Sequence, residues 1–438
     1  MLRFGTDGVR GDADTDLTSP LVIALGRAAA RVLGSDAFLI GRDPRESGPR
    51  IEADLTQGLQ AEGTQVLSLG VASTPAIAFL AQRSGIPAAI VSASHNTWSD
   101  NGVKIVGPDG RKLADAVEAA IESELRTLLD ESTEPLPETV FQPEVEVDLD
   151  AYVEHLLSAL EGRKLAGLRV VVDCANGAAS ELAPRALLAA GAQVDVINAQ
   201  PDGRNINAGC GSTYPEQLQA AVLAARADLG LALDGDADRV LAVDENGQLV
   251  DGDQLMVMTA RDWHERGMLR NDAIVVTVMS NLGLRRALAE AGVGIVETPV
   301  GDRNVTVAMA EHDIAIGGEQ SGHIVFADLA TTGDGVLTGL IVADQLARRG
   351  VKMSALASAM TRLPQVLVNV RVAAGADPGR SPGVQAAVQA VEAQLGDRGR
   401  VMVRSSGTEP VVRVMVEAPT EDEATAAAAR VRSALEQA

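Results

Sequence analysis

The chain has 438 residues, of which 46% are hydrophobic and 22% are charged, proportions that exclude a disordered or fibrous protein. Aromatic residues make up only 2%, so the core must be built from Ala, Val, Leu and Ile. The formal net charge of −23 excludes non-specific binding to nucleic acid, because the phosphates would be repelled. At about 150 residues per domain, a chain of this length contains roughly three domains.

The sequence shows no sign of an oxidising compartment or a membrane. Cys174 and Cys210 are too few for a disulfide framework and predict reduced thiols in a cytoplasmic protein. The N-terminal sequence MLRFGTDGVRG carries charges where a signal peptide has an apolar segment. The longest apolar stretches, such as 24–33, contain arginine, so we expect no membrane-spanning helix.

The chain repeats one order of predicted elements three times, with short β-branched runs alternating with segments of helical periodicity. The first repeat has strands at 37–43, 65–70 and 88–96 and helices at 48–62 and 76–85. The second has strands at 168–177, 193–203 and 229–239 and helices at 181–191 and 215–226. The third has strands at 273–281, 294–303 and 314–323 and helices at 283–292 and 304–313.

This order predicts an α/β protein with three similar mixed α/β domains, whose parallel-rich sheets are covered on both faces. The remaining sequence has strands at 363–373, 400–403 and 411–418 and helices near 381–395 and at the C-terminus. It predicts a smaller C-terminal α+β domain. An acidic, proline-containing stretch at 130–149 has the composition of an inter-domain connection. We therefore expect four domains around a central cleft, at 1–149, 150–250, 251–363 and 364–438.

Each repeat ends in a polar loop after its third strand: SASHN, DGDADR and GGEQSGH. Ligands of open α/β sheets bind beyond the carboxyl ends of the strands. Three equivalent loops are therefore expected to converge on one site.

The DGDADR loop places Asp234, Asp236 and Asp238 two residues apart, so on an extended backbone they share one face. Three carboxylates there need a cation, and their oxygens suit Mg²⁺. We exclude an EF-hand, because Arg239 stands where that loop needs Gly and the flanking segments resemble strands. A solvated acidic turn is the alternative interpretation.

The SASHN loop places Ser94 at the end of an apolar strand, beside His95. No G-x-S-x-G sequence surrounds this serine, so a serine hydrolase is not supported. A phosphorylated serine could supply a further ligand to the metal, although a polar turn or helix cap is the simpler alternative. Lys104 lies on a predicted hairpin over 101–113.

Two further loops carry polar groups suited to sugars and phosphates. RSSGTEP offers the Arg404 guanidinium, several hydroxyls and a glycine, which together could form a phosphate cradle without the spacing of a Walker loop. GGEQSGH offers Glu319 and Ser321 to sugar hydroxyls and His323 to a phosphate. An ordinary hairpin turn and an ordinary glycine-rich turn are the respective alternatives.

The segments FGTDGVRG, SASHN, DGDADR, GEQSGH and RSSGTEPVVRVMVE, in this order, resemble the α-D-phosphohexomutase superfamily. Within it, they are most similar to the family of bacterial phosphoglucosamine mutases. The resemblance covers essentially the whole chain. It implies an isomerase in which a phosphoserine passes its phosphoryl group to a sugar phosphate and takes back the other phosphate, with a hexosamine 1,6-bisphosphate as intermediate and activator. Glucosamine 6-phosphate and glucosamine 1-phosphate would be interconverted for peptidoglycan precursor synthesis.

The same resemblance implies a site with four groups of residues. One Mg²⁺ per subunit would be held by phosphorylated Ser94, Asp234, Asp236 and Asp238. The phosphoryl-transfer region would be lined by Arg10, His95, Lys104 and Arg239. The sugar would be bound by Gly301, Asp302, Arg303, Glu319, Ser321 and His323. The distal phosphate would be held by Arg404, Ser406, Gly407 and Thr408.

Several questions stay open at the level of sequence. Lys104 or His95 could be the general acid/base, and Asn304 stands where the family is expected to have Tyr. The expected partner is a small-molecule sugar phosphate, with no nucleic acid or membrane; a homodimer and an activating protein kinase are compatible with the resemblance. A phosphoglucomutase/phosphomannomutase is the second hypothesis, and a non-catalytic sugar-phosphate-binding protein is the third. A metal-dependent phosphatase is disfavoured, because a mutase must exclude water from its phosphoserine.

Overall fold

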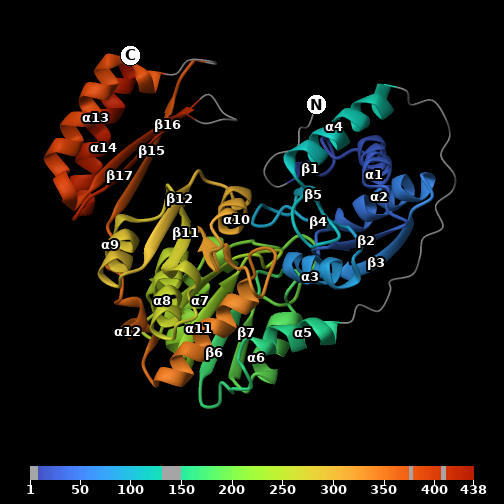
Figure 1. The fold of residues 1–438 in the computed structure, drawn as a ribbon, viewed down its shortest axis with the longest axis horizontal. Coiled ribbons are helices and arrows are strands. Elements are labelled where there is room, and N and C mark those ends of the chain that lie inside the picture. The colour runs from blue at the N-terminus through green and yellow to red at the C-terminus, as the bar shows by residue number, and fades with distance from the viewer. Residues whose placement is uncertain (1–7, 131–148, 374–377, 406–410) are drawn as a thin grey trace. The chain divides into compact units, whose positions relative to one another are not determined.

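The computed structural model describes residues 8–130, 149–373, 378–405 and 411–438. The chain forms two compact units. One comprises Met1–Val278 and Val293–Ala357, and the other comprises Met279–Gly292 and Ser358–Ala438. Within the described ranges, the first unit contains three sheets and the second contains one; Figure 1 shows the sheets among their helices.

The first sheet has the strand order β1-β5-β4-β2-β3. Its strands are β1 (Val9–Asp12), β2 (Ala37–Arg42), β3 (Gln65–Val71), β4 (Ala88–Val91) and β5 (Asp100–Val106). The helices are α1 (Ser19–Leu33), α2 (Gly48–Ala61), α3 (Thr74–Ser84) and α4 (Asp115–Asp130). Strand β2 pairs in parallel with β3 and β4, and β5 is antiparallel to β4 and β1.

The second sheet has the order β10-β9-β8-β6-β7. Its strands are β6 (Arg169–Asp173), β7 (Gln193–Ile197), β8 (Leu229–Leu233), β9 (Val240–Asp244) and β10 (Leu249–Val250). The accompanying helices are α5 (Leu149–Ser158), α6 (Leu182–Ala189), α7 (Glu216–Ala225) and the 3₁₀ turn Gly211–Thr213.

The third sheet has the order β12-β11-β13-β14, with β11 (Ala273–Thr277), β12 (Gly294–Thr298), β13 (Ile316–Gly318) and β14 (Ile324–Phe326). Around it in the chain are α8 (Gly252–Glu265), the 3₁₀ turn Arg270–Asp272, α10 (Asp302–Glu311), α11 (Gly335–Arg349) and α12 (Met353–Ala357).

The three sheets share one topology. In each, the first strand of the predicted repeat lies between the second and the third, both parallel to it, and the third pairs with an antiparallel strand. The prediction of three similar mixed α/β domains is confirmed. The predicted hairpin at 101–113 is different: β5 is an interior strand, and its return arm is reduced to a single bridge between Val106 and Lys112.

Side chains alternate across the first sheet and fill two cores. Phe38 and Ile40 on β2 face the helices α1, α2 and α4, whereas Leu39 faces α3. Successive residues of a strand point to opposite faces, so a wholly apolar strand is what a sheet covered on both sides requires. Figure 1 shows α3 on the side of this sheet opposite α1 and α2.

The second unit contains a three-stranded antiparallel sheet of order β15-β17-β16. Its elements are α9 (Leu282–Glu290), β15 (Gln365–Arg371), α13 (Pro382–Leu395), β16 (Arg400–Ser405), β17 (Val411–Glu417), α14 (Glu421–Glu436) and the 3₁₀ turns Pro378–Arg380 and Gly396–Arg398. Alternate valines of β17 pack with α13 and α14 in one core. The predicted smaller C-terminal α+β domain is confirmed. None of the helices in the described ranges has both the length and the apolar character needed to cross a membrane.

Candidate functional site

Ser94 lies in the loop that follows β4, three residues beyond the end of the strand. Its side chain is 1% exposed, and its Oγ donates a hydrogen bond of 2.6 Å to Oδ2 of Asp234. The backbone of Ser94 has φ +52°, a left-handed conformation that is uncommon for a residue with a Cβ. The serine is therefore held in an unusual conformation that directs its hydroxyl at a carboxylate of another domain.

The three aspartates lie in the equivalent loop after β8. Asp234, Asp236 and Asp238 are all buried, and each offers an oxygen within 4.8 Å of the others. Their backbone is not extended, contrary to the prediction from sequence. The chain turns at Ala237, which has φ +59° and donates its N–H to the Asp234 carbonyl at 3.1 Å. The turn, rather than strand alternation, brings the carboxylates together.

Lys104 supplies a positive charge to this cluster. Its Nζ lies 3.0 Å from Oδ2 of Asp236 and 3.5 Å from Oδ2 of Asp238. Burial raises the pKa of Asp236, but the Lys104 ammonium and a 2.6 Å hydrogen bond from Thr74 outweigh it and hold that pKa below its usual value. Burial and then the two neighbouring carboxylates raise the pKa of Asp234 well above its usual value, and the Arg239 charge and the hydrogen bond from Ser94 only partly oppose this.

The donor set fits a hard cation. Oδ1 of Asp236 and Oδ1 of Asp238 are buried and have no hydrogen-bond partner among the described residues. Buried carboxylate oxygens without a partner are costly, and Mg²⁺ takes oxygen ligands of this kind. The three aspartates could therefore hold one Mg²⁺, with Ser94 beside it.

Three further predicted residues surround Ser94. His95 Nδ1 lies 3.4 Å from Ser94 Oγ. Burial, and then the positive charges of Arg239 and Arg10, lower the pKa of His95 to about 4, so this imidazole is neutral at pH 7. Arg239 also lies 3.7 Å from Asp238 and donates its backbone N–H to Asp234. The structure thus brings Arg10, His95, Lys104 and Arg239 around the carboxylates.

The GGEQSGH loop packs against the aspartate loop, because Val240 N donates to Gly322 O at 3.1 Å. Glu319 Oε1 accepts the N–H of Gly301 at 3.0 Å, which ties the two predicted sugar-binding segments together. Ser321 Oγ is buried without a hydrogen-bond partner in the described part of the chain. These groups are available to a polar ligand.

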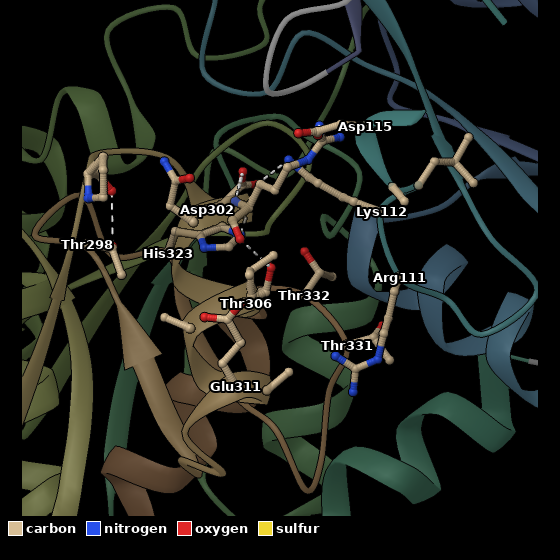
Figure 2. Close-up of a pocket in the computed structure, with 18 residues that line it drawn as sticks. Arg111, Lys112, Asp115, Thr298, Asp302, Thr306, Glu311, His323, Thr331 and Thr332 are labelled. Atoms are coloured by element: carbon tan, nitrogen blue, oxygen red, sulfur yellow. Dashed lines mark hydrogen bonds and ion pairs between the residues drawn. The ribbon is translucent and has the colours of Figure 1, made fainter. Parts of the chain in front are cut away.

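A pocket of about 600 Å³ adjoins the predicted sugar loop. Figure 2 shows Asp302 and His323 on one side of it and Arg111, Lys112 and Asp115 on the other. Asp302 is ion-paired with Lys112, and Arg303 is ion-paired with Asp115 and Glu118 of α4. The two charged residues of the predicted sugar loop therefore contact the first domain in this structure.

His323 is 2% exposed. Its Nε2 accepts the Gly333 N–H at 3.2 Å and lies 3.9 Å from Asp302. The ring is thus placed between the pocket and the aspartate loop, since a Cβ added to Gly333 would lie 2.6 Å from the Asp238 carbonyl.

The predicted phosphate loop belongs to the second unit. Arg404 lies near the end of β16, directly opposite Arg413 of β17, whereas Ser406, Gly407 and Thr408 lie outside the described residues. Like charges opposite one another in a ladder are unfavourable, and an anion between them would relieve the repulsion. Arg413 was not among the residues predicted from sequence. Strand alternation around the loop could have found it.

Thr74 was also missed. It begins α3, and its N–H donates to the Asp236 carbonyl at 3.0 Å while its hydroxyl binds the side chain. The only signal in the sequence is a Thr-Pro pair at a helix start, which is common.

Four family models match the chain in succession. They are the phosphoglucomutase/phosphomannomutase alpha/beta/alpha domain I at residues 1–131, domain II at 150–247, domain III at 251–363 and the C-terminal domain at 367–434. Among curated proteins, the phosphoglucosamine mutase of Mycolicibacterium paratuberculosis is 51% identical over 440 residues, covering 99% of this chain and 98% of the relative. The phosphoglucosamine mutase of Mycobacterium tuberculosis is 50% identical over 441 residues with the same coverage.

Solved structures share the fold. A phosphoglucomutase/phosphomannomutase family protein from Burkholderia thailandensis has a TM-score of 0.80 and 26% identity, covering 99% of this chain and 97% of its own. Aspergillus fumigatus N-acetylphosphoglucosamine mutase, solved with GlcNAc-6P and magnesium, has a TM-score of 0.70 and 22% identity, covering 100% and 96%. The likeness extends over the full length of both proteins.

Proposed function

The chain belongs to the phosphoglucomutase/phosphomannomutase family and is a mutase of the isomerase class, and we propose that it interconverts glucosamine 6-phosphate and glucosamine 1-phosphate. The observation that carries the proposal is the 2.6 Å contact between Ser94 Oγ and Asp234 within a cluster of three buried aspartates. The identity of about half of all residues with phosphoglucosamine mutases favours the amino sugar.

In the proposed cycle, the phosphorylated Ser94 gives its phosphoryl group to the free hydroxyl of the sugar monophosphate. The bond between phosphorus and Ser94 Oγ breaks, a bond to the sugar oxygen forms, a base of the enzyme takes the proton of the sugar hydroxyl, and Ser94 Oγ gains a proton. The resulting hexosamine 1,6-bisphosphate reverses its ends, and Ser94 takes back the other phosphate. Atoms and charge balance over the cycle, and the net change is the position of one phosphate.

Asp234, Asp236 and Asp238 would hold Mg²⁺ with the Ser94 phosphate. When bound there, the ion would neutralise charge that develops on the transferring phosphoryl group. Lys104 contributes a second positive charge from a fixed position, because two carboxylates hold its ammonium.

The position of His95 favours it as the group that exchanges a proton with Ser94. Its Nδ1 lies 3.4 Å from the hydroxyl, and apo geometries of catalytic hydrogen bonds are often long. The Lys104 ammonium is instead engaged by Asp236 and Asp238, which suits electrostatic stabilisation. We therefore propose His95 as the general acid/base.

The remaining predicted residues would hold the sugar phosphate. We propose that Glu319 and Ser321 contact hydroxyls, that His323 and the 301–303 loop line the sugar, and that Arg404, Ser406, Gly407 and Thr408 hold the distal phosphate. Such an anchor is needed because Ser94 engages only one phosphate of the bisphosphate at a time.

The test compares purified protein on the 6-phosphates of glucosamine, glucose and mannose. The ammonium of glucosamine adds a charged contact, so kcat/KM should be at least about 10-fold higher for glucosamine 6-phosphate, which corresponds to roughly 1.4 kcal/mol. A preference for mannose 6-phosphate would instead support a phosphoglucomutase/phosphomannomutase. Ser94→Ala is the control: it should abolish most turnover while retaining sugar-phosphate binding. Intact-mass measurement should find a phosphate on the wild type alone.

The same assays distinguish a mutase from a binding protein and from a phosphatase. A binding protein would show no turnover and no phosphorylated Ser94, and a phosphatase would release inorganic phosphate instead of the isomer. Ser94 must acquire its first phosphate either from added hexosamine 1,6-bisphosphate or from a protein kinase. Recharging of dephosphorylated protein by the bisphosphate alone would make a kinase dispensable. We also propose that the protein is cytoplasmic and that it forms a homodimer. Light scattering of the full chain would test the homodimer.

A further inference from the structure

We propose that Arg45 is a positioning residue for phosphoryl transfer: its guanidinium holds the backbone of residues 94–100 so that the Ser94 hydroxyl faces Asp234. The inference rests on the proposed phosphoserine function. It names a residue that none of the polar loops contains and that touches neither the carboxylate cluster nor Ser94 Oγ in this structure.

Arg45 is 1% exposed and belongs to the largest fully buried side chains of the described residues. It stands between β2 and α2. Its Nε donates to Oδ2 of Asp43 at 2.9 Å. Nη1 donates to the carbonyls of Thr97 and Asp100, and Nη2 donates to the carbonyls of Ser94 and Asn96, both at 2.9 Å.

These bonds use all five N–H groups that an arginine side chain carries. Four of the five go to backbone carbonyls of a single loop. A buried guanidinium would be costly without partners, so the complete set of bonds implies that the loop and the arginine fold as one piece. The planar guanidinium therefore fits one conformation of residues 94–100.

A second donor reaches the same carbonyls from the second domain. Asn207 Nδ2 lies 2.9 Å from the Ser94 carbonyl and 3.0 Å from that of Asn96. Gly235 completes the contact, since a Cβ there would lie 2.6 Å from the Ser94 carbonyl. The Ser94 carbonyl is therefore held by residues of both domains, and its contact with Gly235 lies directly beside Asp234.

The amide of Ser94 is fixed as well. Ser94 N donates to Ser92 Oγ at 2.9 Å, and Ser92 Oγ donates to Oδ2 of Asp43 at 2.6 Å. Asp43 in turn binds the Arg45 guanidinium. The backbone N–H and C=O of Ser94 are thus tied to the two ends of one buried ion pair.

Fixing both backbone groups fixes the side chain. A residue with φ +52° stays in that conformation only where its surroundings over-determine it. With the N–H and C=O of Ser94 held, the direction of its Cα–Cβ bond is set, and Oγ can reach Asp234 by a single torsion. Arg45 therefore acts on the reaction through the orientation of Ser94.

Lysine cannot replace this arginine. An ammonium presents three donors from one nitrogen, whereas the carbonyls are met here by two separate nitrogens of a rigid plane. Arg45→Lys keeps the charge opposite Asp43 and removes the planar arrangement, so it isolates geometry from charge. Arg50 offers a matched control on the same segment. It also donates to backbone carbonyls, those of Ala13 and Leu17, and within the described ranges none of its hydrogen bonds reaches the 94–100 loop.

The experiment measures steady-state turnover, melting temperature and release of inorganic phosphate for full-length Arg45→Lys, Arg45→Ala and Arg50→Lys. We expect Arg45→Lys to lower kcat by about 100-fold, the effect expected of misplacing a reacting atom by about 1 Å, while KM changes by less than about 2-fold. Phosphate release per turnover should rise, because a misdirected phosphoserine reacts with water. Arg50→Lys should lower the melting temperature without changing kcat or KM.

Added guanidinium ion provides a readout that a merely structural role would not move. It should restore turnover of Arg45→Ala in a saturable manner and leave Arg50→Lys unaffected. The proposal is overturned if Arg45→Lys keeps the wild-type kcat, or if folded Arg45→Ala loses turnover without any rescue. Should Arg45→Ala not fold, Arg45→Lys decides alone, and an unchanged kcat in that variant contradicts the proposal.

The outcome can be separated from that of the proposed function. If wild-type protein carries no phosphate on Ser94 and Ser94→Ala remains active, the function is wrong. If the wild type is phosphorylated and Ser94→Ala is inactive but the Arg45 variants behave like the wild type, only the positioning role is wrong.

Discussion

This protein contains ion pairs of two kinds, one fully buried and one with an exposed partner. At the Ser94 centre, Asp236 and Lys104 are both buried and lie 3.0 Å apart, with Thr74 as a further donor. Beside the 301–303 loop, Arg303 binds Glu118 and Asp115, whose side chain is 84% exposed. The Asp236–Lys104 pair cannot separate without leaving a buried charge, whereas Arg303 can exchange its exposed partner Asp115 for solvent or a ligand while Glu118 stays largely buried beside it.

The difference separates two requirements of the proposed reaction. The group that carries phosphate must be held in place throughout the cycle, which favours buried pairs that cost several kcal/mol to break. The loop that contacts the sugar must release it while the intermediate reverses its ends. The Arg303–Asp115 pair, whose carboxylate is exposed, is of the surface kind worth about 0–1 kcal/mol, and it permits this.

The largest effect is expected from Asp236→Asn. The substitution removes one negative charge from the cluster and leaves Lys104 buried with a weaker partner, so affinity for Mg²⁺ should fall by at least about 10- to 100-fold, the range known for groups that only support metal ligands. Titration of activity with Mg²⁺ and calorimetric Mg²⁺ binding would measure this. Wild-type Mg²⁺ dependence in the variant would contradict the metal site.

Asp334 tests whether the Lys104 ammonium, rather than burial, keeps the pKa of Asp236 low at the Ser94 centre. This carboxyl is buried at the start of α11, where it accepts the Leu337 N–H at 2.9 Å and the Tyr152 hydroxyl, and no cation of the described residues contributes to its ionisation. Burial raises the pKa of Asp334 to about 6. Because the folded state then binds the proton more tightly than the unfolded state, the free energy of unfolding should fall as pH rises from about 4 to about 6.

The size of this effect follows from the shift of roughly two pH units, which gives at most about 3 kcal/mol lost by pH 7. Asp334→Asn keeps the helix cap and should abolish this part of the pH dependence in thermal melts. Tyr152→Phe is the matched comparison: it removes a bond that lowers the pKa of Asp334, so the loss should extend to higher pH. An identical pH profile for wild type and Asp334→Asn would show that burial does not raise this pKa.

The smallest effect is expected at the 301–303 loop. If Arg303 contacts the sugar phosphate as proposed, the double variant Asp115→Asn/Glu118→Gln removes its competing partners. KM should then fall by about 2- to 5-fold, the equivalent of roughly 0.4–1 kcal/mol for exposed pairs. Glu122→Gln is the control on the same helix, since Glu122 pairs only with Arg126 among the described contacts. An unchanged or higher KM in the double variant would count against a sugar-binding role for Arg303.

Much of the fold could be predicted from sequence because each repeat has its own local pattern. Buried parallel strands such as β6 contain an apolar run, here three successive valines, and amphipathic helices alternate with them. The same reasoning placed Ser94 and the three aspartates at strand ends, since a polar loop after an apolar strand is visible in the letters alone. The domain boundaries at 149, 250 and 363 remain predictions.

The contacts that organise the site could not be predicted in this way. Arg45 and Asn207 bind backbone carbonyls, which every residue has, so no letter at position 94 or 96 indicates them. Asp236 depends on Lys104, 132 residues away along the chain, and only the packing of two domains brings them together. The turn at Ala237 was missed because alanine rarely adopts a left-handed conformation.

The common strand order of the three sheets has a consequence for how such an enzyme can change over evolution. Three copies of one supersecondary unit present the same position, after the third strand, and we propose three different tasks for it: nucleophile, metal ligands and sugar recognition. Because the scaffold sets each position independently of the letters in the loop, one copy can diverge while the others stay constant. New sugar preferences are therefore expected to arise by substitution in the third copy, with the phosphoryl-transfer chemistry of the first two inherited unchanged.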